Sequence, residues 1–264
     1  GQTVARLGGD ELTVVLSGAD TKPLARDVAE RIIHRFREPF SIAGHSIVCT
    51  VSIGIALCPD HGDTLEALLK HADTAMYAAK LSGRNNFQLF TTSMGEAATR
   101  KLDIEARLRR GIERGEFVLH YQPVVDMRSG KTQGLEALLR WQDPERGLVG
   151  PASFIPNAEE SGLILPLGAW VIDEVARQID AWQHQGVSLA VSLNLSARQF
   201  SQQGLVEHLL RVARRCAGSV LELEITESLL LDPSARGIDT LTRLRAEGVR
   251  IAIDDFGTGY SSLA

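Results

Sequence analysis

Long hydrophobic runs are missing from this sequence of 264 residues. No apolar segment approaches the ~20 residues that a membrane-spanning helix needs, and no secretory signal pattern is visible. We therefore expect no membrane segment within this stretch. The sequence starts with Gly1 rather than Met, so we expect the full-length protein to carry further residues before it.

Cysteine is also scarce, because only Cys49, Cys58 and Cys216 are present. Their spacing is not that of a metal site, and their odd number does not suit a disulfide framework. Unpaired, scattered thiols are typical of a reduced compartment. We therefore expect a cytoplasmic protein.

An excess of positive charge is absent as well: 28 Lys and Arg residues stand against 33 Asp and Glu, a formal net charge of −5. This balance argues against nucleic-acid binding by charge alone. A nucleotide ligand would have to be held by a metal ion and by local cations. The hydrophobic share of 44% and the charged share of 23% are ordinary for a soluble globular protein, and the length suggests two domains, one of which could be incomplete.

A carboxylate in the middle of an apolar strand is the most unusual feature of the sequence. Glu136 lies within the run Gly134–Arg140, which is otherwise rich in Leu and Ala. Burying a carboxylate is costly unless it is paired or binds a metal. We therefore expect the partners of Glu136 to come from other segments of the chain.

Three later apolar segments also end in an acid or an amide: Leu189–Asn194, Val220–Glu227 and Val249–Asp255. Each is followed by turn residues and a helical pattern. Strands that alternate with helices and carry polar groups at their carboxyl ends indicate a (β/α) barrel, whose active sites lie at that end. Such oxygen ligands suit Mg²⁺ or Mn²⁺ rather than zinc. The groups expected to meet are Glu136, Asn194, Glu224, Asp254 and Asp255.

Four motifs follow one another in this part of the chain: Glu136-Ala-Leu, Asn194-Leu-Ser, Glu224-Ile-Thr-Glu227 and Asp254-Asp-Phe-Gly-Thr-Gly-Tyr, with Tyr121-Gln-Pro ahead of them. In this order they resemble the EAL domain of cyclic di-GMP phosphodiesterases. The resemblance runs from about Leu102 to the last residue, and we assign residues 101–264 to this domain. It implies metal-dependent hydrolysis of cyclic di-GMP to the linear dinucleotide pGpG.

The resemblance also implies roles for single residues. Glu136, Asn194, Glu224 and Asp254 would hold one Mg²⁺ or Mn²⁺ ion, and Asp255 would reach a second. Four residues are expected to be catalytic: Glu136, Glu227, Asp254 and Asp255. Glu227 would order the loop that begins at Phe256. Arg140 would hold a substrate phosphate, and Gln122 is a further candidate for a substrate contact.

The first part of the chain carries a second set of motifs: Arg6-Leu-Gly-Gly-Asp10-Glu11-Leu, Val51-Ser-Ile-Gly-Ile-Ala and Ala72-Asp-Thr-Ala-Met-Tyr-Ala-Ala-Lys80-Leu-Ser-Gly-Arg84-Asn. The first predicts a hairpin that displays two carboxylates at its turn. Together they resemble the C-terminal half of a GGDEF domain, the diguanylate cyclase module, over residues 1–90.

This second resemblance implies GTP as a substrate of the full-length protein. Asp10 would be a catalytic metal ligand and Glu11 a nucleotide contact. Lys80 and Arg84 would contact phosphates. From the residues alone, Lys80 and Arg84 could equally be solvated cations that balance the dipole of a helix.

The remaining elements follow from apolar periodicity and turn residues. Helices are predicted over residues 23–36, 64–82, 165–185 and 205–216, and strands over 40–42, 47–57, 117–125 and 132–141. Residues 91–100 read as a polar linker, and 100–114 as a charged, solvated helix. Phe154, Trp170 and Trp182 are expected to pack in the core.

The sequence thus predicts an α/β protein in which a partial GGDEF domain, an α+β sheet, precedes an incomplete (β/α)8 barrel. We expect a cyclic di-GMP phosphodiesterase fused to a cyclase module, as a homodimer in the full-length protein. A non-hydrolysing cyclic di-GMP receptor is the alternative, although the intact ligand set favours an enzyme. Because only five of eight barrel strands can be counted, we expect the 264-residue polypeptide alone to be poorly stable and inactive.

Overall fold

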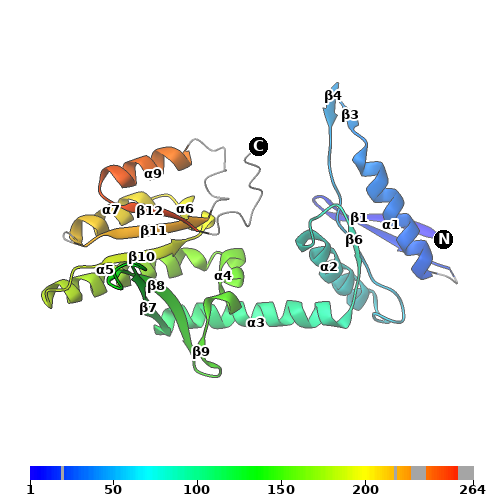
Figure 1. The fold of residues 1–264 in the computed structure, drawn as a ribbon. Coiled ribbons are helices and arrows are strands. Elements are labelled where there is room, and N and C mark those ends of the chain that lie inside the picture. The colour runs from blue at the N-terminus through cyan, green and yellow to red at the C-terminus, as the bar shows by residue number, and fades with distance from the viewer. Residues whose placement is uncertain (19–20, 217–218, 227–235, 255–264) are drawn as a thin grey trace. The chain divides into compact units, whose positions relative to one another are not determined.

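The computed structural model of the chain describes residues 1–18, 21–216, 219–226 and 236–254 (Figure 1). By their contacts, the residues form two compact units, Gly1–Leu102 and Asp103–Ala264. Each unit has its own sheets and its own hydrophobic cluster.

Three pairs of strands and two helices lie wholly within the first unit, among its described residues. β1 (Gln2–Gly8) pairs with β2 (Glu11–Leu16), β3 (Phe40–Ile42) with β4 (His45–Ile47), and β5 (Ile53–Ile55) with β6 (Phe87–Leu89). The helices are α1 (Thr21–Arg37) and α2 (Leu65–Leu81). The hairpin predicted at the start of the chain is confirmed, since β1 and β2 are antiparallel. The strand predicted over 47–57 is wrong in its extent. Ile47 ends β4 and pairs with Phe40, residues 53–55 form β5, and residues 48–52 between them are not in a strand.

The helix α2 lies directly on β5. Thr64 caps its start by accepting a hydrogen bond from the backbone N–H of Ala67 at 3.2 Å. Gly54 of β5 allows the close approach, because a Cβ atom there would lie 1.9 Å from the carbonyl oxygen of Ala72. The contact between this strand and this helix is therefore one of backbone against backbone.

The helix α3 (Thr92–Arg114) is continuous over its 23 residues. It begins at Thr92 rather than at Arg100, because the expected linker contains Met94, Glu96, Ala97 and Ala98, which favour helix. The prediction of a solvated helix is wrong for this part of α3, because Arg107 is only 9% exposed and Leu108 is fully buried. Arg107 can be buried because a carboxylate, Asp143, lies against it.

The second unit is built on one sheet with the strand order β12-β11-β10-β8-β7, and β9 pairs with the other side of the β8 end. Its strands are β7 (Phe117–Val125), β8 (Thr132–Asp143), β9 (Gly147–Val149), β10 (Ala190–Leu195), β11 (Leu221–Thr226) and β12 (Arg250–Asp254). β8, β10, β11 and β12 are parallel to one another. These four strands confirm the predicted alternation with helices.

β7 departs from that alternation, since it runs antiparallel to β8. Only residues 126–131 join the two strands, too few for the crossover that a parallel pair requires. Asp126 fixes this short turn by accepting hydrogen bonds from Ser129, one from its backbone N–H at 2.6 Å and one from its hydroxyl at 2.7 Å.

Helices pack against one face of the sheet (Figure 1). They are the 3-10 helix η1 (Pro151–Ser153), α4 (Ile155–Ser161), α5 (Ile164–His184), α6 (Ala197–Phe200), α7 (Leu205–Arg215) and α9 (Arg236–Ala246). α5 and α7 match their predicted positions to within a residue. Phe154 is fully buried, and Trp170 and Trp182 pack on the core, as predicted. The opposite face of the sheet carries polar and charged side chains, among them Glu136, Ser192, Asn194 and Glu224, beside apolar ones such as Leu138 and Ala252.

Candidate functional site

The even-numbered residues of the parallel strands face away from the helices. Their odd-numbered neighbours, such as Leu193, are buried beneath α5 and α7. The register places Glu136 beside Ser192 and Asn194 beside Glu224. Side chains at paired positions point to the same face of a sheet, so these groups share one surface.

The candidate ligands are staggered by two residues between β8 and β10 and again between β11 and β12, while Asn194 and Glu224 are direct register partners. Asn194 lies two residues beyond the β10 partner of Glu136, and Asp254 lies two residues beyond the β12 partner of Glu224. Strands in a barrel tilt, and their register shifts accordingly. In tilted strands, this register shift places the candidate ligands at a similar level along the barrel axis, near the carboxyl ends of the strands.

One direct contact joins two of these groups. The Nδ2 atom of Asn194 donates a hydrogen bond to Oε1 of Glu136 at 3.0 Å. Asn194 and Asp254 are exposed, whereas Glu136 and Glu224 are partly buried. The amide of Asn194 thus links β10 to β8 and also carries an oxygen that suits a hard cation.

Glu224 lies in a setting that disfavours its negative charge. Burial raises the pKa of Glu224, and the carboxylates of Glu136, Asp254 and Glu222 raise it further, while the Ser192 hydroxyl opposes the change. Carboxylates gathered on one surface in this way fit a bound divalent cation, which would remove their mutual repulsion. The oxygen-only donor set suits a hard ion rather than a soft one.

The two candidate substrate contacts lie on β7, which carries no candidate ligand, and on β8, which carries Glu136. Gln122 of β7 is the register partner of Glu136, so the two side chains are neighbours across the pair. Arg140 lies four residues after Glu136, near the end of β8, and is partly buried. Its Nη1 atom donates to the carbonyl oxygen of Leu139 at 2.8 Å.

Glu227 and Asp255 lie outside the described residues, and their roles stay predictions. Within residues 1–18, 21–216, 219–226 and 236–254, no three His, Cys, Asp or Glu side chains are grouped closely enough to hold a metal ion. The predicted set depends on an amide, Asn194, and on Asp255 in addition to three carboxylates. The assignment of these ligands therefore remains a proposal.

In the first unit, the predicted carboxylates lie at the hairpin turn. Asp10 is in the turn itself and Glu11 is the first residue of β2, and both are exposed. Gly9 has a positive φ of 53°, which glycine adopts without strain. Arg6 holds the turn, because its Nε and Nη2 atoms donate to the carbonyl oxygen of Gly9 at 3.0 and 2.6 Å.

Lys80 and Arg84 lie near the end of α2 and are exposed. The backbone between them turns through Gly83, whose φ is 98°. In the part of the chain that the structure describes, no hydrogen bond or ion pair joins either cation to the Asp10–Glu11 turn. A shared phosphate site for these four residues stays a prediction.

Two features of the second unit were not found from the sequence. Ser192 is 6% exposed and stands between Glu136 and Glu222 in the register; counting two residues back from Asn194 would have placed it on the site face. The buried pair of Arg107 and Asp143 joins residues that are far apart in the sequence. No local pattern signals such a pair.

Residues 105–264 match the family described as "EAL domain", and residues 1–86 match "Diguanylate cyclase, GGDEF domain". The chain belongs to the EAL domain family. The predicted order, GGDEF and then EAL, is confirmed, and so is the barrel-type fold class.

Two curated relatives of this EAL family chain match almost all of it. "Cyclic di-GMP phosphodiesterase PdeR" of Escherichia coli (strain K12) is 42% identical over 265 residues, which are 100% of this chain and 40% of PdeR. "Bifunctional diguanylate cyclase/cyclic di-GMP phosphodiesterase MucR" of Pseudomonas aeruginosa is 43% identical over 264 residues, 99% of this chain and 38% of MucR. The chain thus spans two fifths or less of these relatives.

A solved structure titled "PaMucR Phosphodiesterase, c-di-GMP complex" is similar to the chain with a TM-score of 0.56 and 43% sequence identity, covering 61% of this chain and 66% of that one. No helix among the described residues is both long enough and apolar enough to cross a membrane.

Proposed function

We propose that the full-length protein containing this chain hydrolyses cyclic di-GMP to pGpG in a reaction that depends on a divalent metal ion. The observation that carries the proposal is the arrangement of one candidate ligand on each of four adjacent parallel strands, on one face of the sheet. These ligands are Glu136, Asn194, Glu224 and Asp254. The names of the relatives PdeR and MucR, "cyclic di-GMP phosphodiesterase" and "bifunctional diguanylate cyclase/cyclic di-GMP phosphodiesterase", support the same activity.

The ion that we propose is Mg²⁺ or Mn²⁺, because every donor in the set is oxygen. When bound, a pair of such ions neutralises an anionic phosphodiester and supplies hydroxide near pH 7. Glu136, Asn194, Glu224 and Asp254 would hold the first ion, and Asp255 would reach toward the second. The hydrogen bond from Asn194 to Glu136 would keep these two ligands oriented toward each other.

Substrate contacts are assigned to groups at the same end of the sheet. Arg140 presents a planar fork of donors that can hold a phosphate in bidentate fashion. Gln122, beside Glu136 in the register, can donate a hydrogen bond to the nucleotide. Glu227 would order the loop that begins at Phe256; both residues lie outside the described part of the chain.

For the GGDEF half we propose GTP as the ligand in the full-length protein. Asp10 would bind the metal and Glu11 the nucleotide, while Lys80 and Arg84 would contact phosphates. The exposure of all four side chains is compatible with ligand access. The homodimer expected for the full-length protein also stays a prediction.

Product analysis tests the proposed activity. The purified full-length protein, incubated with cyclic di-GMP and Mn²⁺, should yield pGpG on chromatography, and a chelator should stop the reaction. Glu136→Ala should lower turnover on the order of 10³-fold or more, because a metal ligand is lost.

Glu222→Gln is the matched control, since Glu222 lies on the same face of β11 as Glu224 but is not a proposed ligand; its turnover should stay within about threefold. Near wild-type turnover in Glu136→Ala would refute the metal assignment. Tight binding of cyclic di-GMP without any product would favour a receptor instead.

A further inference from the structure

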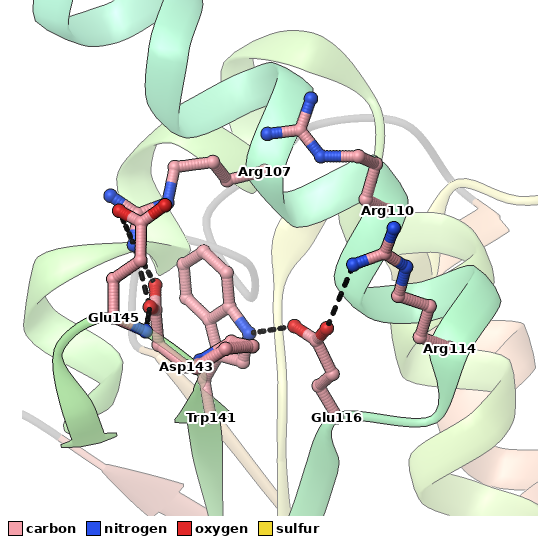
Figure 2. A pocket seen from close by; sticks show the side chains of 8 residues that line it. Arg107, Arg110, Arg114, Glu116, Trp141, Asp143 and Glu145 are labelled. Carbon is pink, nitrogen blue, oxygen red and sulfur yellow. Dashed lines mark hydrogen bonds and ion pairs between the residues drawn. The ribbon is translucent and has the colours of Figure 1, made fainter.

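A buried ion pair joins the C-terminal part of α3 to the end of β8 (Figure 2). Arg107 is 9% exposed and Asp143 is 2% exposed. Nη2 of Arg107 donates to both carboxylate oxygens of Asp143 and also lies 3.3 Å from Oε2 of Glu145. Breaking such a pair on one side leaves a buried charge without its partner, so the pair fixes how α3 and β8 meet.

Asp143 has a second task, because it also organises the turn after β8. Its Oδ1 atom accepts hydrogen bonds from the backbone N–H groups of Glu145 at 2.8 Å and Arg146 at 3.1 Å. Burial alone would raise the pKa of Asp143, but these N–H groups and the Arg107 guanidinium hold that pKa below its ordinary value. The carboxylate is therefore ionised at neutral pH and available to Arg107.

The residues just before Asp143 are tied to the start of β7. The indole N–H of Trp141 donates to Oε2 of Glu116 at 3.1 Å (Figure 2). The backbone N–H of Gln142 donates to the carbonyl oxygen of Glu116 at 2.7 Å. α3 lies close by, since a Cβ atom on Gly111 would come within 2.9 Å of the Trp141 nitrogen. These contacts hold the end of β8 against the start of β7 and against α3.

The inner face of the same strand end carries Arg140. Side chains alternate along a strand, so Arg140 shares a face with Glu136, while Trp141 and Asp143 point to the opposite side. The pairing of β8 with β10 covers only Gly134–Ala137. Beyond that point β8 pairs with β7 and β9 alone. Arg140 is therefore paired on one side only, with Val118 of β7, whereas Glu136 has partners on both sides, Gln122 of β7 and Ser192 of β10. The position of Arg140 depends on the contacts that hold this end of β8.

We propose that Arg107 and Asp143 are positioning residues for the phosphodiesterase reaction. Their ion pair holds the end of β8 so that the Arg140 guanidinium meets a substrate phosphate. The inference rests on the proposed function, because it takes Arg140 as a phosphate contact. A bidentate contact tolerates little displacement, so loosening the β8 end should weaken substrate binding more than it disturbs the metal ligands.

The test uses the full-length protein with Arg107→Gln, Asp143→Asn and the double variant Arg107→Gln/Asp143→Asn. We would measure kcat and KM for cyclic di-GMP, the Mn²⁺ activation midpoint, and the Kd for cyclic di-GMP with the metal chelated. Each single variant should raise KM and Kd about tenfold and leave the activation midpoint unchanged. The double variant should recover most of the loss, because two amides can hydrogen-bond without leaving a buried charge unpaired.

Arg109→Gln is the matched control on the same helix. Arg109 is 62% exposed and lies 3.7 Å from Glu105 in a surface pair, so its loss should change neither KM nor Kd. If the neutral variants do not fold, Arg107→Lys is the alternative test. It keeps the positive charge but lacks the planar guanidinium that makes two contacts, so it should raise KM about threefold or more.

Wild-type KM and Kd in the single variants or in Arg107→Lys, or a fall in melting temperature with binding unchanged, would overturn this inference alone. Equal losses in metal activation and substrate binding would also overturn it. If the wild-type protein neither binds nor cleaves cyclic di-GMP, the proposed function fails, and this inference fails with it.

Discussion

At the scale of single residues, Arg140 offers a sharp test because arginine and lysine differ in shape rather than in charge. Arg140→Lys in the full-length protein should weaken cyclic di-GMP affinity about tenfold or more, since a point charge cannot form the bidentate contact. The Mn²⁺ activation midpoint should not change. Titrations with nucleotide and with metal measure the two effects separately.

Arg128→Lys, in the short turn between β7 and β8, is the control and should leave both titrations unchanged. If Arg140→Lys weakened metal and nucleotide binding to the same extent, Arg140 would belong to the scaffold of the sheet.

Asp143 gives a prediction about pH. Its folded-state pKa is depressed, so the stability it contributes is present above the pKa of the unfolded chain, about 3.9, and is lost as the pH falls through the lower folded value. Asp143→Asn should therefore melt at a lower temperature than wild type at pH 7, and the difference should narrow below about pH 4. Thermal melts of wild type and Asp143→Asn at pH 7 and at pH 3 measure this difference. A gap that is equally wide at pH 3 would show that the charge of Asp143 does not stabilise the fold.

The sequence predicted some site residues and missed others for a physical reason. Glu136 and Asn194 were predictable because a polar side chain at the end of an apolar strand conflicts with burial unless it serves a site. The pair of Arg107 and Asp143 was not, because its two charges look like surface charges in their own segments. Only the tertiary contact removes both from water.

At the scale of elements, Gly54→Ala tests the contact of β5 with α2. The added Cβ would lie 1.9 Å from the Ala72 carbonyl oxygen and 2.3 Å from the Met76 nitrogen. Both are backbone atoms that cannot rotate away, so the helix must shift. We expect a local destabilisation of about 3 kcal/mol or more, measured as faster amide exchange along α2. Gly8→Ala is the control, since a Cβ at Gly8 would meet nothing within 4 Å; similar exchange in both variants would exclude a close approach.

Elements with a clear period were predicted well, as for α5 and α7, because an apolar stripe defines a helix wherever it packs. The direction of β7 was not predictable from its own residues, since a strand reads alike in both directions. The short turn at 126–131 was the available signal. The predicted helix at 100–114 is shorter than α3, because the polar composition of residues 91–100 indicates a linker, although polarity alone does not end a helix.

At the scale of the whole molecule, the two sets of candidate metal ligands belong to different units. Asp10 lies in Gly1–Leu102, whereas Glu136, Asn194, Glu224 and Asp254 lie in Asp103–Ala264. The separate matches to the GGDEF and EAL families divide the chain in the same order. Ligand binding to one unit should then stabilise that unit by mass action, and groups without shared contacts should act additively.

Metal titration followed by calorimetry of the full-length protein tests this independence. A metal at about 100 times its Kd should stabilise the unit that binds it by about 2.7 kcal/mol, so Mn²⁺ should raise the melting transitions of both units and a chelator should reverse the change. Glu136→Ala should abolish the shift of the EAL transition only, and Asp10→Ala that of the GGDEF transition only. Assigning each transition requires separate signals, for which proteolysis at rising temperature with peptide mapping is suitable. If either substitution removed both shifts, the two sites would be coupled or one of the ligand assignments would be wrong. The double variant would decide between these outcomes, because uncoupled sites predict that its effect equals the sum of the two single effects.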